Sequence, residues 1–375
     1  MNRGENGRKT PSPIVVKVGT STLTGEDDRI DDAFVERFVD DVAAVRLGGR
    51  GVVLVTSGAI RAGVERMNLR GRNLTIPQKQ AAAAVGQGLL INKYTTLFAR
   101  HGIVTSQVLL TRDIVHMRKK YLNARNTLLT LLEYGTVPIV NENDTIACEE
   151  IMFGDNDTLS AITALIVDAD LLVLLSDVDG LYDREPGGGG DARLIPVVEE
   201  ITPEIRELAG GPGTDSGSGG MVTKISAAAV ASEAGIRMVI ANGRTENVVR
   251  RIAGGEPLGT TFLPRESRMS SRKKWLAFGP SAEGRVVVNR GARDMIAGKG
   301  KSLLPAGIVR VEGEFENGAC VEIADEENAV FARGLSNYSS AELATIKGRR
   351  SGEIENRLGF TLGDEAVHRD NLVVL

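Results

Sequence analysis

The sequence predicts an α/β fold: a three-layer αβα sandwich whose central sheet is mainly parallel. Short apolar runs alternate with longer helical patterns along roughly the first 260 residues, which is typical of such folds. Most of these runs lack apolar–polar alternation, as expected for strands that are covered on both faces. Because ligands of parallel sheets bind beyond the carboxyl ends of the strands, functional side chains are expected there.

The first elements are defined by clear patterns. Ile14–Val18 is a β-branched run that predicts the first strand, and Gly51–Val55 predicts the second. Between them, Asp31–Leu47 carries its apolar residues near helical spacing and predicts an amphipathic helix. Ile76–Arg100 is alanine-rich and predicts a long helix that begins near Pro77, a residue favoured in the first turn.

The later elements repeat this alternation. An apolar helix is expected at Leu159–Val167, and another helix is expected to open around Lys224. The further predicted strands are Ile103–Leu109, Val137–Val140, Leu171–Leu175 and Arg237–Ile240. Strands separated by helices in this way predict parallel neighbours in one sheet.

The pattern changes after about residue 261, which predicts a second domain. The run 264–274 holds five basic residues, one acid and three serines, and reads as a linker. Short strand-like runs follow, with a helix expected near Ser339–Ile346. These runs are Gly284–Asn289, Gly307–Glu312, Ala319–Ile323 and Val330–Gly334. We therefore expect domains at 1–263 and 281–375, joined by a linker at 264–280, the second being small and β-rich.

Length and composition set the broad class. A chain of 375 residues exceeds one typical domain, and 42% hydrophobic with 25% charged residues is ordinary for a globular protein. The net charge of −4 provides no overall basic field for nucleic acid or a membrane surface. Cys148 and Cys320 are too few and too distant for a disulfide scaffold, which fits a reducing compartment. Without an apolar run of about 20 residues, the sequence predicts a soluble cytoplasmic protein.

Two lysines stand where a phosphate could bind. Lys17 lies at the end of the first predicted strand, beside a turn at Gly19 whose backbone amides could approach a phosphate. Lys224 lies in the first helical turn after a glycine-rich loop, where backbone amides and the helix dipole favour an anion. Phosphoryl transfer needs positive charge near the moving oxygens, and a carboxylate such as Asp157 could hold both lysines.

A second polar group suits a small zwitterion, with acids for its ammonium and amides for its carboxylates. These candidates are Asn141, Asp144, Asp155 and Asn156. Ser57 could add a hydroxyl, and the turn that follows it could add backbone donors. The three histidines share no metal-ligand spacing, so no metal site made by the protein is predicted.

The order of these motifs resembles the amino acid kinase family. The motifs are Lys-Val-Gly-Thr-Ser at 17–21, Thr-Ser-Gly-Ala at 56–59, Asn-Glu-Asn-Asp at 141–144, Phe-Gly-Asp-Asn-Asp at 153–157, Ser-Asp-Val-Asp-Gly-Leu-Tyr at 176–182 and Gly-Gly-Met-Val-Thr-Lys at 219–224. Within the family, the match is closest to members that phosphorylate glutamate in the first step of proline synthesis. The C-terminal segment resembles the PUA domain that such bacterial enzymes often carry.

The resemblance implies a role for each motif. The catalytic residues would be Lys17, Asp157 and Lys224. The glutamate site would contain Ser57, Asn141, Asp144, Asp155 and Asn156. The ATP site would contain Lys17, Gly19, Ser176, Asp177, Ser218, Gly219, Gly220, Met221, Val222, Thr223 and Lys224. The implied reaction converts ATP and L-glutamate to ADP and γ-glutamyl phosphate, with Mg²⁺ neutralising the phosphates. The family also implies feedback inhibition by proline and assembly into dimers or tetramers.

Two alternatives stay open at this point. One is a sibling acyl-phosphate-forming kinase that acts on aspartate or N-acetylglutamate; the Phe-Gly-Asp-Asn-Asp run and the PUA-like tail argue against it. The other is RNA binding through the tail, since PUA domains elsewhere bind RNA. Residues 281–375 hold 12 Lys and Arg against 15 Asp and Glu, a net charge of −3. This balance disfavours RNA, because tight binding of its phosphates needs clustered positive charge.

Overall fold

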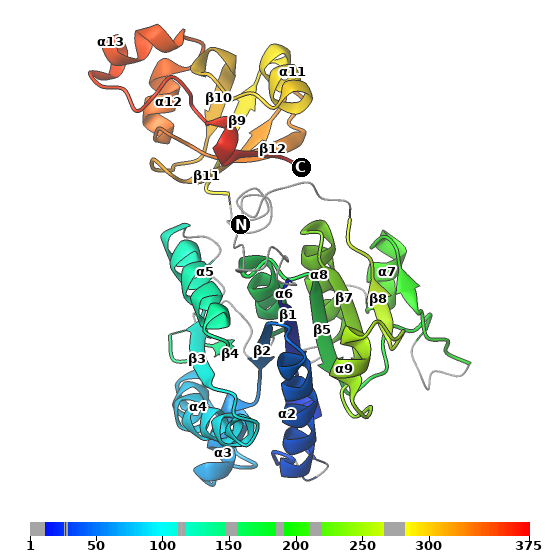
Figure 1. Cartoon of the computed structure of the whole chain (residues 1–375). Helices are drawn as coiled ribbons and strands as arrows, with labels where there is room; N and C mark the ends of the chain where they lie inside the picture. The colour runs from blue at the N-terminus through cyan, green and yellow to red at the C-terminus, as the bar shows by residue number, and fades with distance from the viewer. Residues whose placement is uncertain are drawn as a thin grey trace. The chain divides into compact units, whose positions relative to one another are not determined.

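The computed structural model describes residues 12–25, 27, 29–111, 114, 118–146, 156–184, 191–210, 220–265 and 282–375. The described residues form two compact units, one ending at residue 265 and the other beginning at residue 282 (Figure 1). The predicted linker at 264–280 lies almost wholly outside the described residues. The predicted domain boundaries therefore stay a prediction.

The first unit is built on an eight-stranded sheet in the order β3-β4-β2-β1-β5-β7-β8-β6. The strands are β1 (Ile14–Val18), β2 (Val52–Thr56), β3 (Thr105–Leu110), β4 (Val137–Glu142), β5 (Leu171–Ser176), β6 (Val197–Val198), β7 (Arg237–Asn242) and β8 (Thr260–Phe262). Every pairing is parallel except that between β7 and β8. The mainly parallel sheet predicted from the sequence is confirmed.

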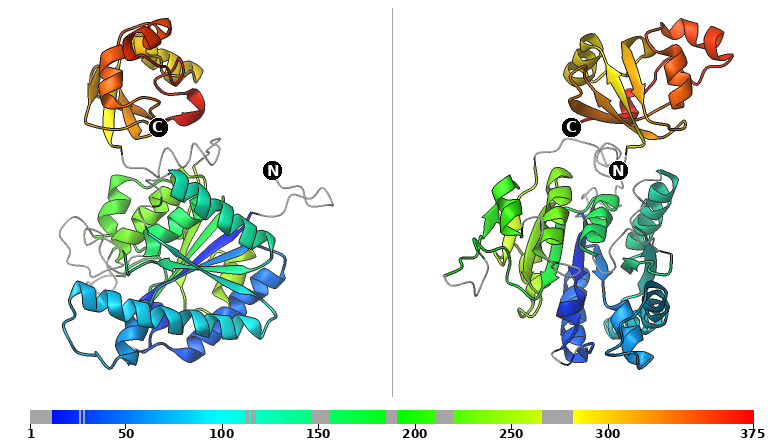
Figure 2. Two further views of the ribbon diagram at one scale, coloured as in Figure 1. Left: turned by 90° about the vertical axis from the view of Figure 1, so that its left-hand side faces the viewer. Right: turned by 180° about the vertical axis from the view of Figure 1, so that it is seen from behind.

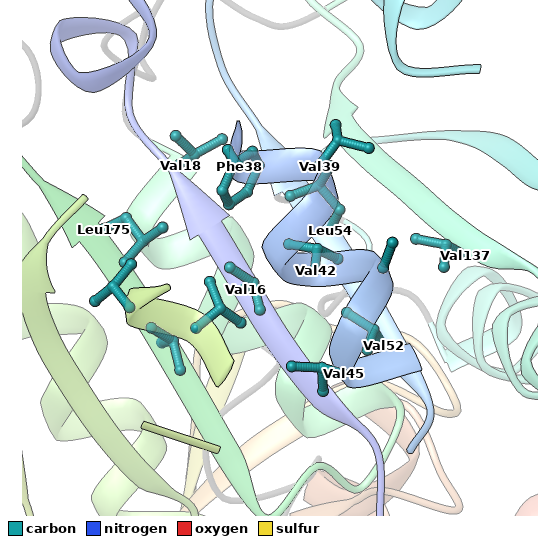
Figure 3. Close-up of a cluster of buried hydrophobic side chains, with 14 of the residues drawn as sticks. Val16, Val18, Phe38, Val39, Val42, Val45, Val52, Leu54, Val137 and Leu175 are labelled. Carbon is teal, nitrogen blue, oxygen red and sulfur yellow. The ribbon is translucent and has the colours of Figure 1, made fainter. Parts of the chain in front are cut away.

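Helices cover both faces of this sheet (Figure 2). They are α1 (Thr20–Leu23), α2 (Asp32–Leu47), α3 (Ala59–Arg66), α4 (Ile76–Ala99), α5 (Arg118–Glu133), α6 (Asn156–Ile166), α7 (Pro203–Leu208), α8 (Met221–Glu233) and α9 (Val248–Ala253). On one face, side chains of α2, α4 and α9 share a core with alternate residues of the central strands. Figure 3 shows α2 placing Phe38, Val39 and Val42 beside Val16 and Leu54. On the other face, α5, α6 and α8 pack against β4, β1 and β7. Among the described residues, no helix could cross a membrane.

Two elements near the strand ends differ from their predicted limits. β4 continues beyond Val140 because Asn141 and Glu142 still pair with Leu109 and Leu110 of β3. α6 begins at Asn156, three residues before the apolar run that predicted it. In both places the strand or helix includes buried polar residues. A prediction based on apolar residues alone therefore makes the element too short. The helices α1, α3, α7 and α9 were not predicted, because they are too short for a periodic pattern. The longer helix α5 and the short strands β6 and β8 were not predicted either.

The second unit has its own five-stranded sheet, in the order β10-β9-β11-β12-β13, and its own hydrophobic core. Its strands are β9 (Gly284–Val288), β10 (Ile308–Glu312), β11 (Cys320–Ala324), β12 (Val330–Leu335) and β13 (Leu372–Val374). Its α-helices are α11 (Arg290–Lys299), α12 (Ser340–Ile346) and α13 (Ile354–Leu358). The predicted helix near residue 339 is α12, whose amino end is closed by a capping box of Ser339 and Glu342. The small β-rich second domain is confirmed, whereas α11, α13 and β13 were not predicted.

Candidate active site

A cavity of about 980 Å³ opens at the carboxyl ends of β1, β2, β4 and β5. Residues predicted from both the phosphate group and the zwitterion group line it together. They are Lys17, Gly19, Ser57, Asn141, Asp144, Asn156, Ser176 and Lys224. Residues up to 207 positions apart in the sequence, from Lys17 to Lys224, thus meet where the parallel sheet was expected to hold its ligands.

Asp157 is fully buried and holds both lysines. Its Oδ1 lies 2.5 Å from Lys17 Nζ, and its Oδ2 lies 3.2 Å from Lys224 Nζ. The Thr223 hydroxyl donates a hydrogen bond to the same Oδ2 at 2.9 Å. Burial acts to raise the pKa of Asp157, but the two ammonium groups and the hydroxyl outweigh it and hold that pKa below its ordinary value. The carboxylate therefore stays ionised and can fix both cations.

Three separate elements bring these groups together. Lys17 is inside β1, one residue before its end, and side chains alternate across a strand. Since Val16 and Val18 face the core of α2, α4 and α9, Lys17 lies on the opposite face, where α6 and α8 pack. Asp157 is in the first turn of α6 and Lys224 is in the first turn of α8. The two lysines thus approach one carboxylate from two directions.

The amino end of α8 is suited to bind phosphate. Gly220 is its N-cap residue, and no side chain caps it in the described part of the chain. The backbone amides of Met221 and the exposed Val222 open the helix, so they lack the intrahelical partners that later residues have. Ser218 and Gly219, predicted to belong to the same loop, lie outside the described residues.

The end of β5 holds the other predicted ATP residues. Ser176 lines the cavity and donates a hydrogen bond from its hydroxyl to Asp177 Oδ1 at 3.0 Å. Asp177 itself is exposed and is not among the residues that line the cavity. Its predicted contact with ATP stays a prediction.

The zwitterion side of the cavity is a network of amides centred on Asn156. The Nδ2 of Asn156 lies within 2.6 Å of the Thr56 carbonyl oxygen, 2.8 Å of Asn141 Oδ1 and 3.1 Å of Ser57 Oγ. An amide nitrogen has two hydrogens, so these acceptors use its full donor capacity. Asn141 in turn donates from its Nδ2 to Gln87 Oε1 at 2.7 Å. The predicted contact of the Asn156 amide with a substrate carboxylate stays a prediction.

Asp144 supplies the acid of this side. Its carboxyl group is half-buried and lines the cavity beside Asn141. Burial raises the pKa of Asp144 to about 6, so the group is ionised at neutral pH at a cost in solvation. A ligand ammonium would offset that cost. Asp155, the second predicted acid, lies outside the described residues.

Comparison with known proteins assigns the chain to a family. Residues 12–242 match the amino acid kinase family over more than half of the chain. The chain belongs to the amino acid kinase family. Residues 284–358 match the PUA domain, which identifies the second unit.

Related kinases match along almost the whole chain. Glutamate 5-kinase of Caldanaerobacter subterraneus subsp. tengcongensis is 51% identical over 362 residues, covering 96% of this chain and 97% of the relative. Glutamate 5-kinase of Moorella thermoacetica is also 51% identical, over 96% of each chain. Glutamate 5-kinase of Geobacter sulfurreducens is 47% identical, over 96% of this chain and 97% of the relative.

For an amino acid kinase, this arrangement can carry out phosphoryl transfer to an anionic acceptor. Two ammonium groups can place positive charge on the phosphoryl oxygens, and the capless start of α8 can add backbone amides. The amide and acid cluster on the other side can orient a small amino acid. The part of the chain that the structure describes contains no cluster of His, Cys, Asp and Glu that could hold a metal ion.

Some residues in and around the cavity were missed from the sequence. Gln87 does not line the cavity, but it accepts a hydrogen bond from Asn141, which does. It was read only as part of an alanine-rich helix, although a lone polar residue among small ones was a signal. Four basic residues line the cavity and were not predicted: Arg61, Arg70, Arg72 and Lys79. The run Arg-Gly-Arg-Asn at 70–73 was visible, but a basic surface loop is usually solvated.

Proposed function

We propose that this chain is a glutamate 5-kinase, which transfers the γ-phosphoryl group of ATP to the side-chain carboxylate of L-glutamate. The products are ADP and γ-glutamyl phosphate, and the reaction is the first step of proline biosynthesis. The observation that carries the proposal is Asp157, buried between Lys17 and Lys224 at the cavity where the amide cluster begins. Relatives about half identical over 96% of the chain, all named glutamate 5-kinase, support it.

The reaction depends on positive charge near the phosphoryl oxygens rather than on proton transfer by the protein. A glutamate side chain is already ionised at neutral pH, since its ordinary pKa is about 4.3, and needs no base to become a nucleophile. A carboxylate oxygen attacks the γ-phosphorus, the bond to the β-phosphate oxygen breaks, and ADP leaves. Lys17 and Lys224 lower the barrier by neutralising charge on the phosphoryl oxygens, and Asp157 keeps both in position.

Glutamate would bind at one end of the cavity and ATP at the other. The α-ammonium of glutamate would lie with Asp144 and the amide cluster, so that the side-chain carboxylate extends towards the two lysines. Asp155 and Ser57 would complete the glutamate site. ATP would take Gly19, Ser176, Asp177 and the segment 218–224. Mg²⁺ would enter as part of the MgATP substrate, held chiefly by the phosphates.

A single assay tests the proposal. Purified protein is incubated with MgATP, L-glutamate and hydroxylamine, and acyl phosphate is measured as the hydroxamate. We expect hydroxamate formation that depends on both ATP and glutamate. Aspartate and N-acetylglutamate serve as comparison substrates for the sibling kinases. Faster reaction with either comparison substrate than with glutamate would overturn the assignment.

Three further properties are proposed from the family resemblance. They are feedback inhibition by proline, assembly into dimers or tetramers, and a cytoplasmic location. A proline titration in the same assay tests the first, and light scattering at several protein concentrations tests the second. No observation on the second unit favours RNA binding as a separate function.

A further inference from the structure

One continuous stretch of the first unit carries basic residues and no acid. Between Glu65 and Asp113 the sequence contains no aspartate or glutamate, whereas it contains seven lysines and arginines. The whole chain has a net charge of −4, so this positive charge is a local feature. The stretch begins at the end of α3 and includes the connection to α4 and the whole of α4. A segment with this charge attracts anions.

Three residues of the stretch line the cavity of the candidate active site. Arg70 and Arg72 lie in the connection between α3 and α4, and Lys79 is the fourth residue of α4. Arg70 forms an ion pair with Glu65 at 3.4 Å. Within the part of the chain that the structure describes, the side chains of Arg72 and Lys79 have no ion pair or hydrogen bond. Their two positive charges are therefore available to a ligand.

The connection that carries these residues is fixed at both ends. The backbone amide of Leu69 donates to the Val64 carbonyl at 2.9 Å, and Thr75 and Gln78 form a capping box at the start of α4. Leu69 and Leu74 are partly buried and line the cavity. The basic side chains thus belong to an ordered part of the cavity wall.

Lys79 lies too far from the amide cluster to hold a substrate that is bound there. Gln87, which accepts a hydrogen bond from Asn141 at 2.7 Å, is eight residues further along the same helix. Eight residues of α-helix span about 12 Å, which exceeds the length of a glutamate molecule. The acids Glu142 and Asp144 lie near the amide cluster, at the end of β4. The cavity is therefore basic at the connection and acidic beside β4.

We propose that Arg70, Arg72 and Lys79 form a positively charged entrance that attracts anionic glutamate to the cavity. This inference rests on the proposed function, and it adds the route by which that substrate arrives. Glutamate has a net charge of −1 at neutral pH, because its two carboxylates outweigh one ammonium. A cleft lined by charge of one sign raises the local concentration of a ligand of the opposite sign. The entrance acts before the reaction, so it lowers the KM for glutamate.

The position of the connection favours glutamate over ATP as the molecule attracted. α3 begins directly after Ser57 and Gly58, which belong to the glutamate end of the cavity. The residues proposed for ATP lie at the end of β5 and the start of α8. In the sheet, β2 and β5 are on opposite sides of β1. Figure 1 shows α3 and α4 on the side of β3 and β4, and α8 on the side of β5 and β7.

The first test measures how salt affects the use of glutamate. The hydroxamate assay gives kcat/KM for glutamate at saturating MgATP over a series of potassium chloride concentrations. The triple variant Arg70→Gln/Arg72→Gln/Lys79→Gln should lower kcat/KM about threefold or more at an ionic strength of about 50 mM. At about 0.5 M the difference should nearly vanish, because salt screens charges that do not touch the ligand.

Reversing the charges gives a result that loss of folding cannot imitate. In Arg70→Glu/Arg72→Glu/Lys79→Glu the entrance repels glutamate, so kcat/KM should rise as salt is added, whereas in the unmodified protein it should fall. A fall with added salt in this variant, as steep as in the unmodified protein, would overturn the proposal.

A matched control separates the entrance from the total charge of the protein. Arg37, Arg206 and Arg250 are exposed residues of the first unit that do not line the cavity. The variant Arg37→Gln/Arg206→Gln/Arg250→Gln has the same change in net charge and should keep the kcat/KM and salt dependence of the unmodified protein. Melting temperatures of all variants are measured in parallel.

Three results would overturn the entrance. They are an unchanged kcat/KM of the first triple variant at low salt, an equal loss in the control variant, and a loss for ATP as large as that for glutamate. Failure of the proposed function looks different: the unmodified protein would then form no hydroxamate from glutamate at any salt concentration.

Discussion

The buried carboxylate of Asp157 determines what the two lysines can do. Removing an ion from water is costly, and two ammonium groups and a hydroxyl are needed to keep this one charged. With two cations and one anion, the group has a surplus positive charge directed at the cavity. That surplus is what a transferring phosphoryl group requires.

Loss of either lysine should therefore reduce turnover. Lys17→Ala and Lys224→Ala should each lower kcat about a hundredfold or more, by analogy with loss of an oxyanion donor. Arginine should rescue poorly, since a planar guanidinium cannot replace a compact ammonium between Asp157 and substrate. Steady-state kinetics on variants with unchanged melting temperature is the measurement. Near-normal turnover of a folded Lys224→Ala protein would contradict the assignment.

Asp144 should make glutamate binding depend on pH. Its pKa is raised to about 6 by burial, so the carboxylate becomes protonated as pH falls through that value. The neutral acid no longer attracts an ammonium, and we expect the KM for glutamate to rise between about pH 7 and pH 5. The effect on the stability of the fold has the opposite pH dependence. Burial disfavours the charged form of Asp144, so its contribution to the free energy of unfolding is present at low pH and is lost as pH rises through about 6.

Asp144→Asn separates this effect from the titration of ATP. The variant should have a high KM for glutamate that changes little across the same pH range, whereas its KM for ATP should follow that of the unmodified protein. A pH profile for glutamate that is unchanged by Asp144→Asn would assign the titration to another group.

At the scale of elements, α3 and α4 approach more closely than side chains would allow. A Cβ on Gly63 would lie 1.7 Å from the Ala82 backbone oxygen, and one on Gly86 would lie 1.8 Å from that of Ala59. The two glycines adjoin each other, since a Cβ on Gly86 would also lie 2.4 Å from the backbone nitrogen of Gly63. This backbone-to-backbone packing sets the position of the loop at residues 57–59.

Alanine at these positions should separate the helices. We expect Gly63→Ala and Gly86→Ala each to lower the free energy of unfolding by about 1–3 kcal/mol or more, through overpacking. Gly88→Ala is the matched control on α4, because nothing lies within 4 Å of the added Cβ. It should be neutral or stabilising by about 0.5–1 kcal/mol, as alanine favours a helix interior. The free energies of unfolding of the three variants are measured by denaturant unfolding. Equal stability of Gly86→Ala and Gly88→Ala would show that Gly86 is not required for the close packing of α3 and α4.

The sequence predicted the elements better than it predicted the network between them. Lys17, Asp157 and Lys224 could be found because each stands beside a glycine turn or opens a helix, which are local features. The hydrogen bonds that link Gln87 to Asn141 and Asn141 to Asn156 could not be predicted. The first pair is 54 positions apart in the sequence and the second is 15 apart, and both contacts depend on tertiary packing. The direction of the Asn156 amide at the start of α6 follows from the backbone carbonyl of Thr56 in β2, which no local pattern reveals.

At the scale of the whole molecule, all of the residues proposed for the chemistry lie in the first unit. No residue proposed for catalysis or binding lies beyond residue 224, and each unit has its own core. Arg265 still belongs to the first unit, where its side chain pairs with Glu200 and Glu233. We expect a protein that ends after Arg265 to fold and to phosphorylate glutamate.

This truncation is checked by the hydroxamate assay and by thermal unfolding. The full chain is the reference, and the isolated segment 282–375 shows whether the second unit folds alone. An insoluble or inactive truncated protein would show that the PUA domain is needed to complete the kinase fold. Retained activity would make it an accessory domain.

The place of β1 in the sheet bears on how the chain folds while it is being made. β1 is the first strand to be synthesised, yet it lies near the middle of the sheet, between β2 and β5. One edge can pair as soon as β2 exists, but the other stays open until Leu171–Ser176 has left the ribosome. An unpaired apolar edge is prone to aggregate, and long-range parallel pairing is slow. The nascent chain therefore passes through a prolonged stage in which chaperones would have an exposed strand to bind.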